Sequence, residues 1–167
     1  KKRITLSTAG IVPGIDKLAE ECPVSLAISL HATNNYLRDK LVPLNKKYPI
    51  ERLLETCKNY SRATNDNYIT FEYVMLKGVN DSVKEASVLI KLLDGIPAKV
   101  NLIPFNPYKN SSFERSEERA INDFRDKLYK AGIITITRKT RGSDIDAACG
   151  QLVGQVEKRR KNIQNTH

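Results

Sequence analysis

The chain contains few of the residues that build metal sites and disulfide frameworks. Its 167 residues include three cysteines and two histidines. Scattered cysteines in odd number do not form a disulfide framework, so we expect a reducing, cytoplasmic setting. The histidines are His31 and the terminal His167, and neither a Cys-x-x-Cys nor a His-Glu-x-x-His pattern occurs. No metal site is therefore expected among these residues.

Other familiar signatures are also missing. No apolar run approaches the ~20 residues that a membrane-spanning helix requires, so no membrane association is expected. The sequence has no Gly-x-Gly-x-x-Gly or Walker loop, which weakens a dinucleotide or NTPase interpretation. A Ser-His-Asp hydrolase is disfavoured because there is no nucleophile elbow. Aromatic residues make up 7% of the chain without RNP-type motifs, which argues against an RNA-binding module of that kind.

What the chain does have is positive charge. The formal net charge is +9 at pH 7, and such an excess favours an anionic partner, with nucleic acid as the first candidate. A solvated basic surface is an equally good interpretation of charge alone.

Strand and helix patterns alternate along the chain, which predicts a single α/β domain over residues 1–167 with parallel strands joined by helices. Apolar alternation and turn residues delimit these elements. Strands are predicted at residues 4–7, 24–31, 68–76, 100–104 and 133–137, and helices at 14–21, 50–62, 82–93 and from 116 to near 132.

The second predicted strand distinguishes an open sheet from a barrel. Its large aliphatic residues fall on one face, whereas Ser25, Ala27, Ser29 and His31 fall on the other. A doubly covered sheet usually has aliphatic residues on both faces. A small, polar face suits a barrel interior that holds a ligand, and four or five βα units are too few to close a barrel of eight. We therefore expect a partial (βα) barrel.

Functional groups in such folds gather at the C-terminal ends of the strands. Ser7, Ser29, His31 and Asn106 lie at or just after predicted strand ends. They either hydrogen-bond a polar small molecule or satisfy local turns. Glu72, in the middle of a strand, is expected to be buried as a structural partner.

The three thiols differ in their surroundings. Cys149 follows basic residues, has small neighbours and stands at the predicted start of a final helix, an environment that favours a reactive thiolate. Cys57 lies on an apolar helical stripe and is expected in the core. Cys22, just before Pro23, is expected to be structural filler.

Five segments in order closely resemble the C-terminal half of the radical SAM adenine-C2 RNA methyltransferases, the RlmN group. The sister group, which methylates C8 of the same adenine, is the alternative. The segments are 4–13 (ITLSTAGIVP), 29–32 (SLHA), 71–76 (FEYVML), 101–107 (NLIPFNP) and 138–152 (RKTRGSDIDAACGQL).

The resemblance implies the C-terminal part of a radical SAM (βα)₆ core, starting near its third strand. Family members bind S-adenosylmethionine (SAM) beside a 4Fe-4S cluster that an electron donor reduces. The motif match implies SAM contacts at Ser7, Ser29, Leu30, His31 and Asn106.

The resemblance also implies that Cys149 is the catalytic cysteine that carries the methyl group. Adenine C2 is a weak nucleophile, whereas a thiolate accepts a methyl group from SAM readily. A second SAM then supplies the radical that activates this methyl group. The implied substrates are adenines in 23S rRNA and tRNA, with Arg138, Lys139 and Arg141 as RNA contacts.

Several parts of the family pattern do not occur in this sequence. The Cys-x-x-x-Cys-x-x-Cys cluster motif and the resolving cysteine are absent, and both lie upstream in the family. We therefore expect a piece of a longer enzyme that is inactive alone. The alternatives are a degenerate paralogue and a non-catalytic RNA-binding remnant.

Overall fold

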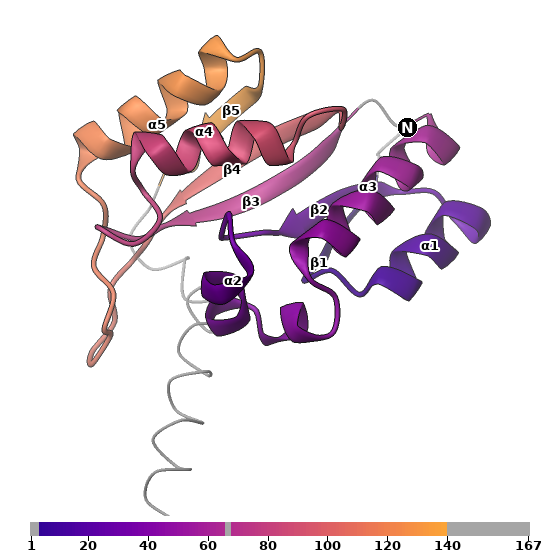
Figure 1. The fold of residues 1–167 in the computed structure, drawn as a ribbon, viewed down its shortest axis with the longest axis horizontal. Coiled ribbons are helices and arrows are strands. Elements are labelled where there is room, and N and C mark those ends of the chain that lie inside the picture. Colours follow the sequence, from indigo (N-terminus) through magenta and orange to yellow (C-terminus); the bar gives the residue numbers. More distant parts are fainter. Residues whose placement is uncertain (1–3, 66–67, 140–167) are drawn as a thin grey trace, which may run out of the picture.

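The structure is a computed structural model that describes residues 4–65 and 68–139. Within them, helices and strands alternate along the chain (Figure 1). The strands are β1 (Thr5–Thr8), β2 (Ser25–Ser29), β3 (Ile69–Met75), β4 (Ala98–Pro104) and β5 (Ile134–Thr137). The α-helices are α1 (Val12–Glu21), α2 (Asn35–Leu41), α3 (Ile50–Thr64), α4 (Val83–Leu92) and α5 (Glu118–Lys130), and η1 (Pro43–Lys46) is a 3-10 helix.

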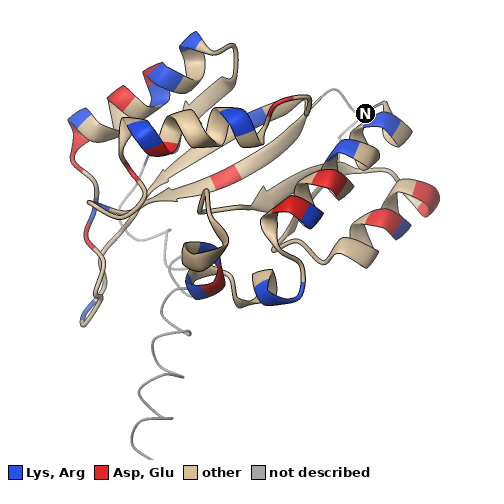
Figure 2. Cartoon of the chain, viewed as in Figure 1, with Lys and Arg blue, Asp and Glu red and all other residues tan. Residues whose placement is uncertain are grey.

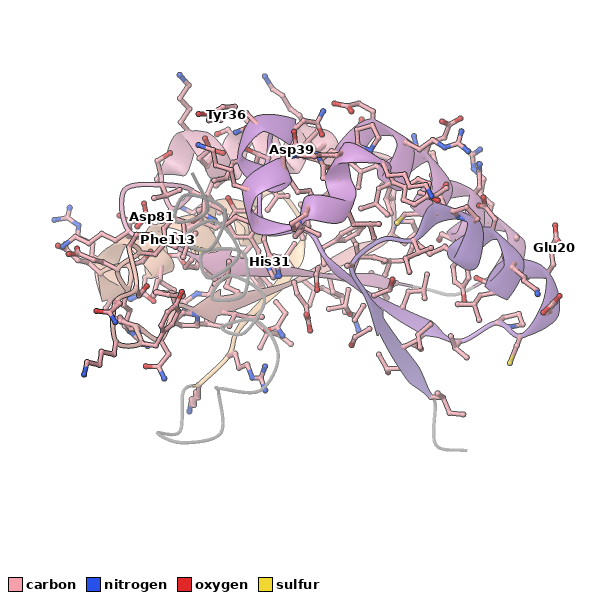
Figure 3. The ribbon with its side chains drawn as sticks, turned by 90° about the horizontal axis from the view of Figure 1, so that it is seen from below. Glu20, His31, Tyr36, Asp39, Asp81 and Phe113 are labelled. Carbon is pink, nitrogen blue, oxygen red and sulfur yellow. The ribbon has the colours of Figure 1, made fainter. Side chains whose placement is uncertain are left out.

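The strands form one five-stranded sheet in the order β1-β2-β3-β4-β5. Every neighbouring pair is parallel, as in Ser29 beside Glu72 and Glu72 beside Asn101. Helices α1, α3, α4 and α5 lie on one side of this sheet (Figures 1 and 3). This confirms the predicted α/β fold, and the sheet with its one layer of helices matches a partial (βα) barrel core.

The main core lies between the sheet and the helices. Ring centroids of Tyr73 on β3 and Phe124 on α5 are 5.1 Å apart, so the Tyr73 face of β3 is the covered one. Helix α3 forms because Ile50, Leu53, Cys57 and similar residues make one apolar stripe, which is buried. We call this side of the sheet the covered face and its opposite the open face.

A smaller cluster lies at the C-terminal ends of the strands. It joins the α2–η1 segment to the ends of β3 and β4, and we call it the rim cluster. Its buried members are Leu41, Val42, Val74, Leu76 and Phe105. Phe105 also meets the rings of Tyr108 and Phe113 edge-on, each at 6.2 Å between centroids. Tyr108 and Phe113, in the segment that follows β4, are therefore packed against the rim cluster.

Most predicted elements agree with the structure to within two residues. Helix α4 begins after Ser82, whose hydroxyl oxygen accepts from the Glu85 N–H at 3.1 Å. Two elements were not predicted, α2 and η1. Both are short, and they lie between Asn34, the N-cap of α2, and the helix α3. Within the described residues, no helix combines the length and the apolar character that crossing a membrane requires.

Candidate cofactor-binding site

Because all five strands are parallel, their C-terminal ends meet at one edge of the sheet. The predicted site residues lie at this edge but differ in exposure. Ser7 is exposed on β1, Ser29 is half-buried at the end of β2, and Asn106 is exposed just beyond β4. Leu30 is fully buried in the main core, and both its N–H and its C=O are hydrogen-bonded. The contact predicted for Leu30 stays a prediction.

His31 is a predicted site residue that is buried at this edge. The prediction extended the second strand to residue 31, but β2 ends at Ser29 and His31 has φ of 61°. Strand alternation therefore does not set the direction of its side chain. Instead, the Val74 N–H donates to His31 Nδ1 at 3.0 Å. An accepting Nδ1 carries no proton, so the proton of the neutral ring is on Nε2.

The Nε2–H of His31 has no hydrogen-bond partner in the described part of the chain, although the atom is buried. Burial, together with the positive charge of Arg38, lowers the pKa of His31 from its ordinary 6.5 to about 4. The ring is therefore neutral at pH 7 and presents one buried donor. Because a buried donor without an acceptor is costly, this atom suits the acceptor of a bound molecule.

The open face carries a polar row across three strands. Ser29, Glu72 and Asn101 are aligned by the strand register, and all three are half-buried. No hydrogen bond or ion pair of these side chains is found among residues 4–65 and 68–139. Glu72 was expected to be buried with a structural partner, and in the described residues it has neither full burial nor that partner. The row leaves donors and acceptors available beside the site edge.

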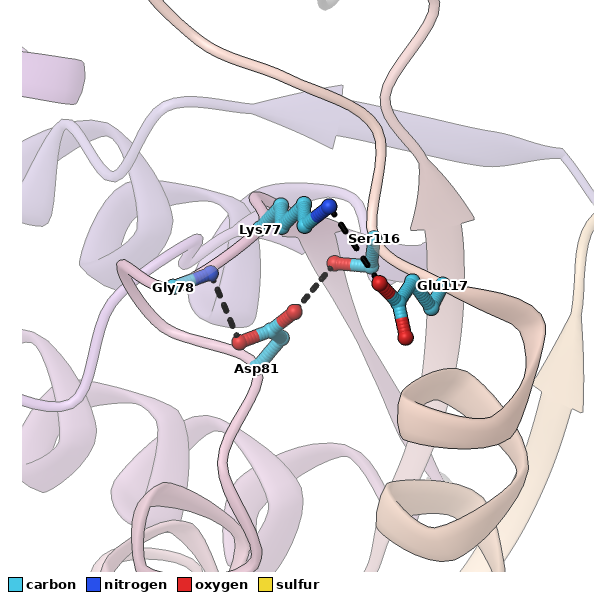
Figure 4. Close-up of polar contacts among 5 residues, drawn as sticks. All are labelled: Lys77, Gly78, Asp81, Ser116 and Glu117. Carbon is cyan, nitrogen blue, oxygen red and sulfur yellow. Dashed lines mark hydrogen bonds and ion pairs between the residues drawn. The ribbon is translucent and has the colours of Figure 1, made fainter.

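Polar contacts tie the loop after β3 to the segment before α5 (Figure 4). Asp81 accepts from the Gly78 N–H at 3.1 Å and from the Ser116 hydroxyl at 2.7 Å. Lys77 Nζ lies 3.2 Å from a carboxylate oxygen of Glu117. These contacts hold the C-terminal end of the segment that carries Asn106. The rim cluster holds its N-terminal end through Phe105.

Two further side chains, which sequence patterns did not reveal, shape this edge. Arg38 is fully buried on α2, and Asn80 is fully buried in the loop after β3. Both hydrogen-bond the backbone around His31. Finding Arg38 would have required the short helix α2 to be predicted first, because only then does its position on the buried side with Leu41 become visible.

The predicted thiol and part of the basic cluster lie outside the described residues, namely Cys149 and Arg141. Arg138 and Lys139 follow β5 and are exposed at the same edge of the sheet as the other strand ends. Cys57 is buried in the core as predicted, and burial raises its pKa to about 12. Cys22 is exposed at the C-cap of α1, so its interpretation as structural filler was wrong.

Charge on the described helices is mixed. Basic and acidic residues are interspersed over α1, α3, α4 and α5 (Figure 2).

Among the described residues, no group of three His, Cys, Asp or Glu side chains is arranged to hold a metal ion. The described residues therefore do not supply the ligands of an iron–sulfur cluster.

The fold is an α/β half-barrel whose open face carries a row of partly buried polar residues, a candidate ligand site. The profile of the Radical SAM superfamily matches residues 1–89. The chain belongs to this superfamily.

Solved structures agree with this assignment. A radical SAM methyltransferase from Sphaerobacter thermophilus is 50% identical over 89% of this chain, with a TM-score of 0.82, and the match covers 43% of that protein. The chain thus spans less than half the length of this relative. A domain of the pyruvate-formate lyase-activating enzyme from Bacteroides vulgatus is 16% identical, with a TM-score of 0.63. The match covers 81% of this chain and 80% of that domain, and it supports the fold alone.

Proposed function

We propose that this chain is part of a radical SAM RNA methyltransferase that methylates C2 of adenine in 23S rRNA and tRNA. The observation that carries the proposal is the 50% identity with a radical SAM methyltransferase across 89% of the chain. The adenine-C2 specificity rests on the resemblance of the segment around Cys149 to the RlmN group. RNA as the substrate is supported by the net charge of +9 and by the exposed Arg138 and Lys139 at the site edge.

The superfamily implies SAM and a 4Fe-4S cluster as cofactors. The site edge fits SAM, because its buried, unpartnered His31 Nε2–H and its half-buried polar row suit a polar nucleoside. The described residues do not fit the cluster, since they contain no suitable ligand group. We propose that the cluster ligands and the resolving cysteine belong to the remainder of a longer protein.

The residues of this chain would share the work as follows. Ser7, Ser29 and Asn106 bind and orient SAM, and His31 donates its Nε2–H to an acceptor of the cofactor. When bound, SAM supplies an electrophilic methyl group and a source of a carbon radical. The thiolate of Cys149 is the soft nucleophile that accepts and carries the methyl group. Arg138, Lys139 and Arg141 bind RNA phosphates.

The test is methylation by the full-length protein with a substitution at Cys149. Wild-type protein should form 2-methyladenosine in 23S rRNA and tRNA, measured by mass spectrometry of nucleosides. Cys149→Ala should abolish the product, whereas the matched control Cys22→Ala, at an exposed thiol, should retain it. Product formation by Cys149→Ala would show that the catalytic assignment is wrong.

The same assay separates the alternatives. Formation of 8-methyladenosine instead would identify a member of the sister group. We expect the 167-residue chain alone to form no product, because its described residues lack cluster ligands. RNA binding without methylation in the full-length protein would indicate a non-catalytic remnant.

A further inference from the structure

The guanidinium of Arg38 is buried near the C-terminal ends of the strands and hydrogen-bonds three segments of the chain. Its Nε donates to the Leu30 carbonyl at 3.0 Å, and its Nη2 donates to the carbonyls of Ser29 and Ala9, both at 2.8 Å. Its Nη1 donates to Asn45 Oδ1 at 3.1 Å. One side chain therefore joins the loop after β1, the end of β2 and the 3-10 helix η1.

Asn80 hydrogen-bonds the backbone of His31, the residue that follows Leu30. Its Nδ2 donates to the His31 carbonyl at 3.0 Å and to the Val74 carbonyl at 2.8 Å. Its Oδ1 accepts from the Leu76 N–H at 2.8 Å. Asn80 is itself held by Tyr73, whose hydroxyl donates to the Asn80 carbonyl at 2.7 Å.

Together these two side chains bind all three carbonyls of residues 29–31. The segment needs such support because His31 has φ of 61°, a conformation that costs a non-glycine residue free energy. Its N–H groups are also engaged, since the Glu72 carbonyl accepts from both Leu30 and His31. The backbone of the segment is therefore fixed on both sides.

The chemistry of Arg38 is unusual for a residue that merely fills space. Its side chain is fully buried, and its four hydrogen bonds go to uncharged oxygens. No ion pair to Arg38 is found within residues 4–65 and 68–139. Burial lowers its pKa to about 10, so the side chain stays charged at pH 7. The charge of the neighbouring Asp39 raises this pKa only in part, and Asp39 forms no ion pair with Arg38 among the described residues. A buried charge without an ion-pair partner costs free energy that an apolar residue of similar size would not.

We propose that Arg38 and Asn80 are positioning residues, which hold residues 29–31 so that His31 keeps its proton on Nε2 and presents it to the bound cofactor. Both side chains act through the backbone of residues 29–31, and neither needs to contact the ligand. The identity of the ligand as SAM rests on the proposed function, whereas the control of the tautomer rests on the contacts given above.

The tautomer can be read directly by nitrogen NMR of histidine. The chain has two histidines, so ¹⁵N-histidine labelling gives two ring systems, and His31→Gln assigns them. In the ligand-free wild-type chain near neutral pH, His31 should show an unprotonated Nδ1 and a protonated Nε2. A protonated Nδ1, or a mixture of both tautomers, would overturn the proposal without any variant.

Arg38→Lys separates geometry from charge. Lysine keeps the charge but cannot bridge the same four oxygens, because its single ammonium lacks the fork of the guanidinium. We expect a folded chain in which His31 exchanges between tautomers, with Arg52→Lys, at an exposed arginine of α3, as the unchanged control. Asn80→Ala should have the same effect from the other side. An unaltered Nε2–H tautomer in either folded variant would assign that residue a purely structural role.

Kinetics of the full-length protein test whether His31 binds the cofactor. Arg38→Lys should raise the KM for SAM about tenfold with a much smaller change in kcat, as expected for one weakened hydrogen bond in binding. A shifted tautomer with unchanged KM would show that His31 does not bind the cofactor. If the wild-type full-length protein bound no SAM, the proposed function would fail while the NMR result on Arg38 and Asn80 would stand.

Discussion

The two faces of the sheet carry opposite kinds of side chain on the same strands. On the covered face, Phe71 and Tyr73 of β3 are fully buried against the helices. On the open face, Thr70 and Glu72 of the same strand are half-buried and polar. Adjacent residues of one strand therefore differ in role, since the covered face stabilises the fold, whereas we propose that polar groups of the open face bind a ligand. The comparison predicts that substitutions one residue apart have separable effects.

The largest effect on stability should come from the covered face. Phe71→Ala removes a fully buried ring from the main core, which should lower the free energy of unfolding by about 3–5 kcal/mol. Thr70→Ala, the neighbouring change on the open face, should cost less than about 1 kcal/mol. Urea unfolding of both variants measures the difference, and equal losses would remove the distinction between the faces.

His31, at the edge between the faces, should make stability depend on pH. Its pKa in the folded chain is about 4, below the ordinary 6.5, so the unfolded chain binds the proton first as the pH falls. The stabilisation is complete above about pH 6.5 and should decline by about 2.5 kcal/mol on acidification from about pH 7.5 to about pH 4.5.

His31→Gln provides the control for this pH dependence. Other groups titrate equally in both proteins, so the difference between their unfolding free energies isolates His31. Parallel pH profiles for the wild type and His31→Gln would show that the imidazole is not held neutral in the folded chain.

A smaller loss of stability is expected when a hydrogen-bonding hydroxyl is removed on the covered side of the sheet. The Tyr60 hydroxyl of α3 donates to the Val24 carbonyl at 2.6 Å and accepts from the Val24 N–H at 2.9 Å. Tyr60→Phe leaves both backbone groups without this partner and should cost about 1–2 kcal/mol. Tyr48→Phe is the matched control, because no hydrogen bond of the Tyr48 hydroxyl is found among the described residues. Equal stability of the two variants would contradict the bridging role of Tyr60.

The covered face was predictable from the sequence because burial imposes a period on apolar residues. The stripe of α3 and the alternation of β2 determined the order of elements and the fold class. Strand ends also predicted Ser7, Ser29 and Asn106 as edge residues, because parallel strands bring their ends together.

The details of the site were not predictable in the same way. The left-handed conformation of His31 and the burial of Arg38 depend on contacts between segments far apart in sequence. A buried arginine contradicts the usual pattern, and α2 is too short to show a clear helical period. The polar row of Ser29, Glu72 and Asn101 required the strand register, which the sequence of one strand cannot give.

The smallest effect on stability and the sharpest separation of the two faces are expected at Glu72. Its half-buried carboxylate has no partner within the described residues, so Glu72→Gln should change the free energy of unfolding by less than about 1 kcal/mol. In the full-length protein, the same variant should weaken SAM binding or methylation by about tenfold, since a charged acceptor beside the site is lost. Glu55→Gln, at an exposed glutamate of α3, should change neither property. A clear loss of stability in Glu72→Gln would mean that Glu72 supports the fold. The open face would then stabilise the fold as the covered face does.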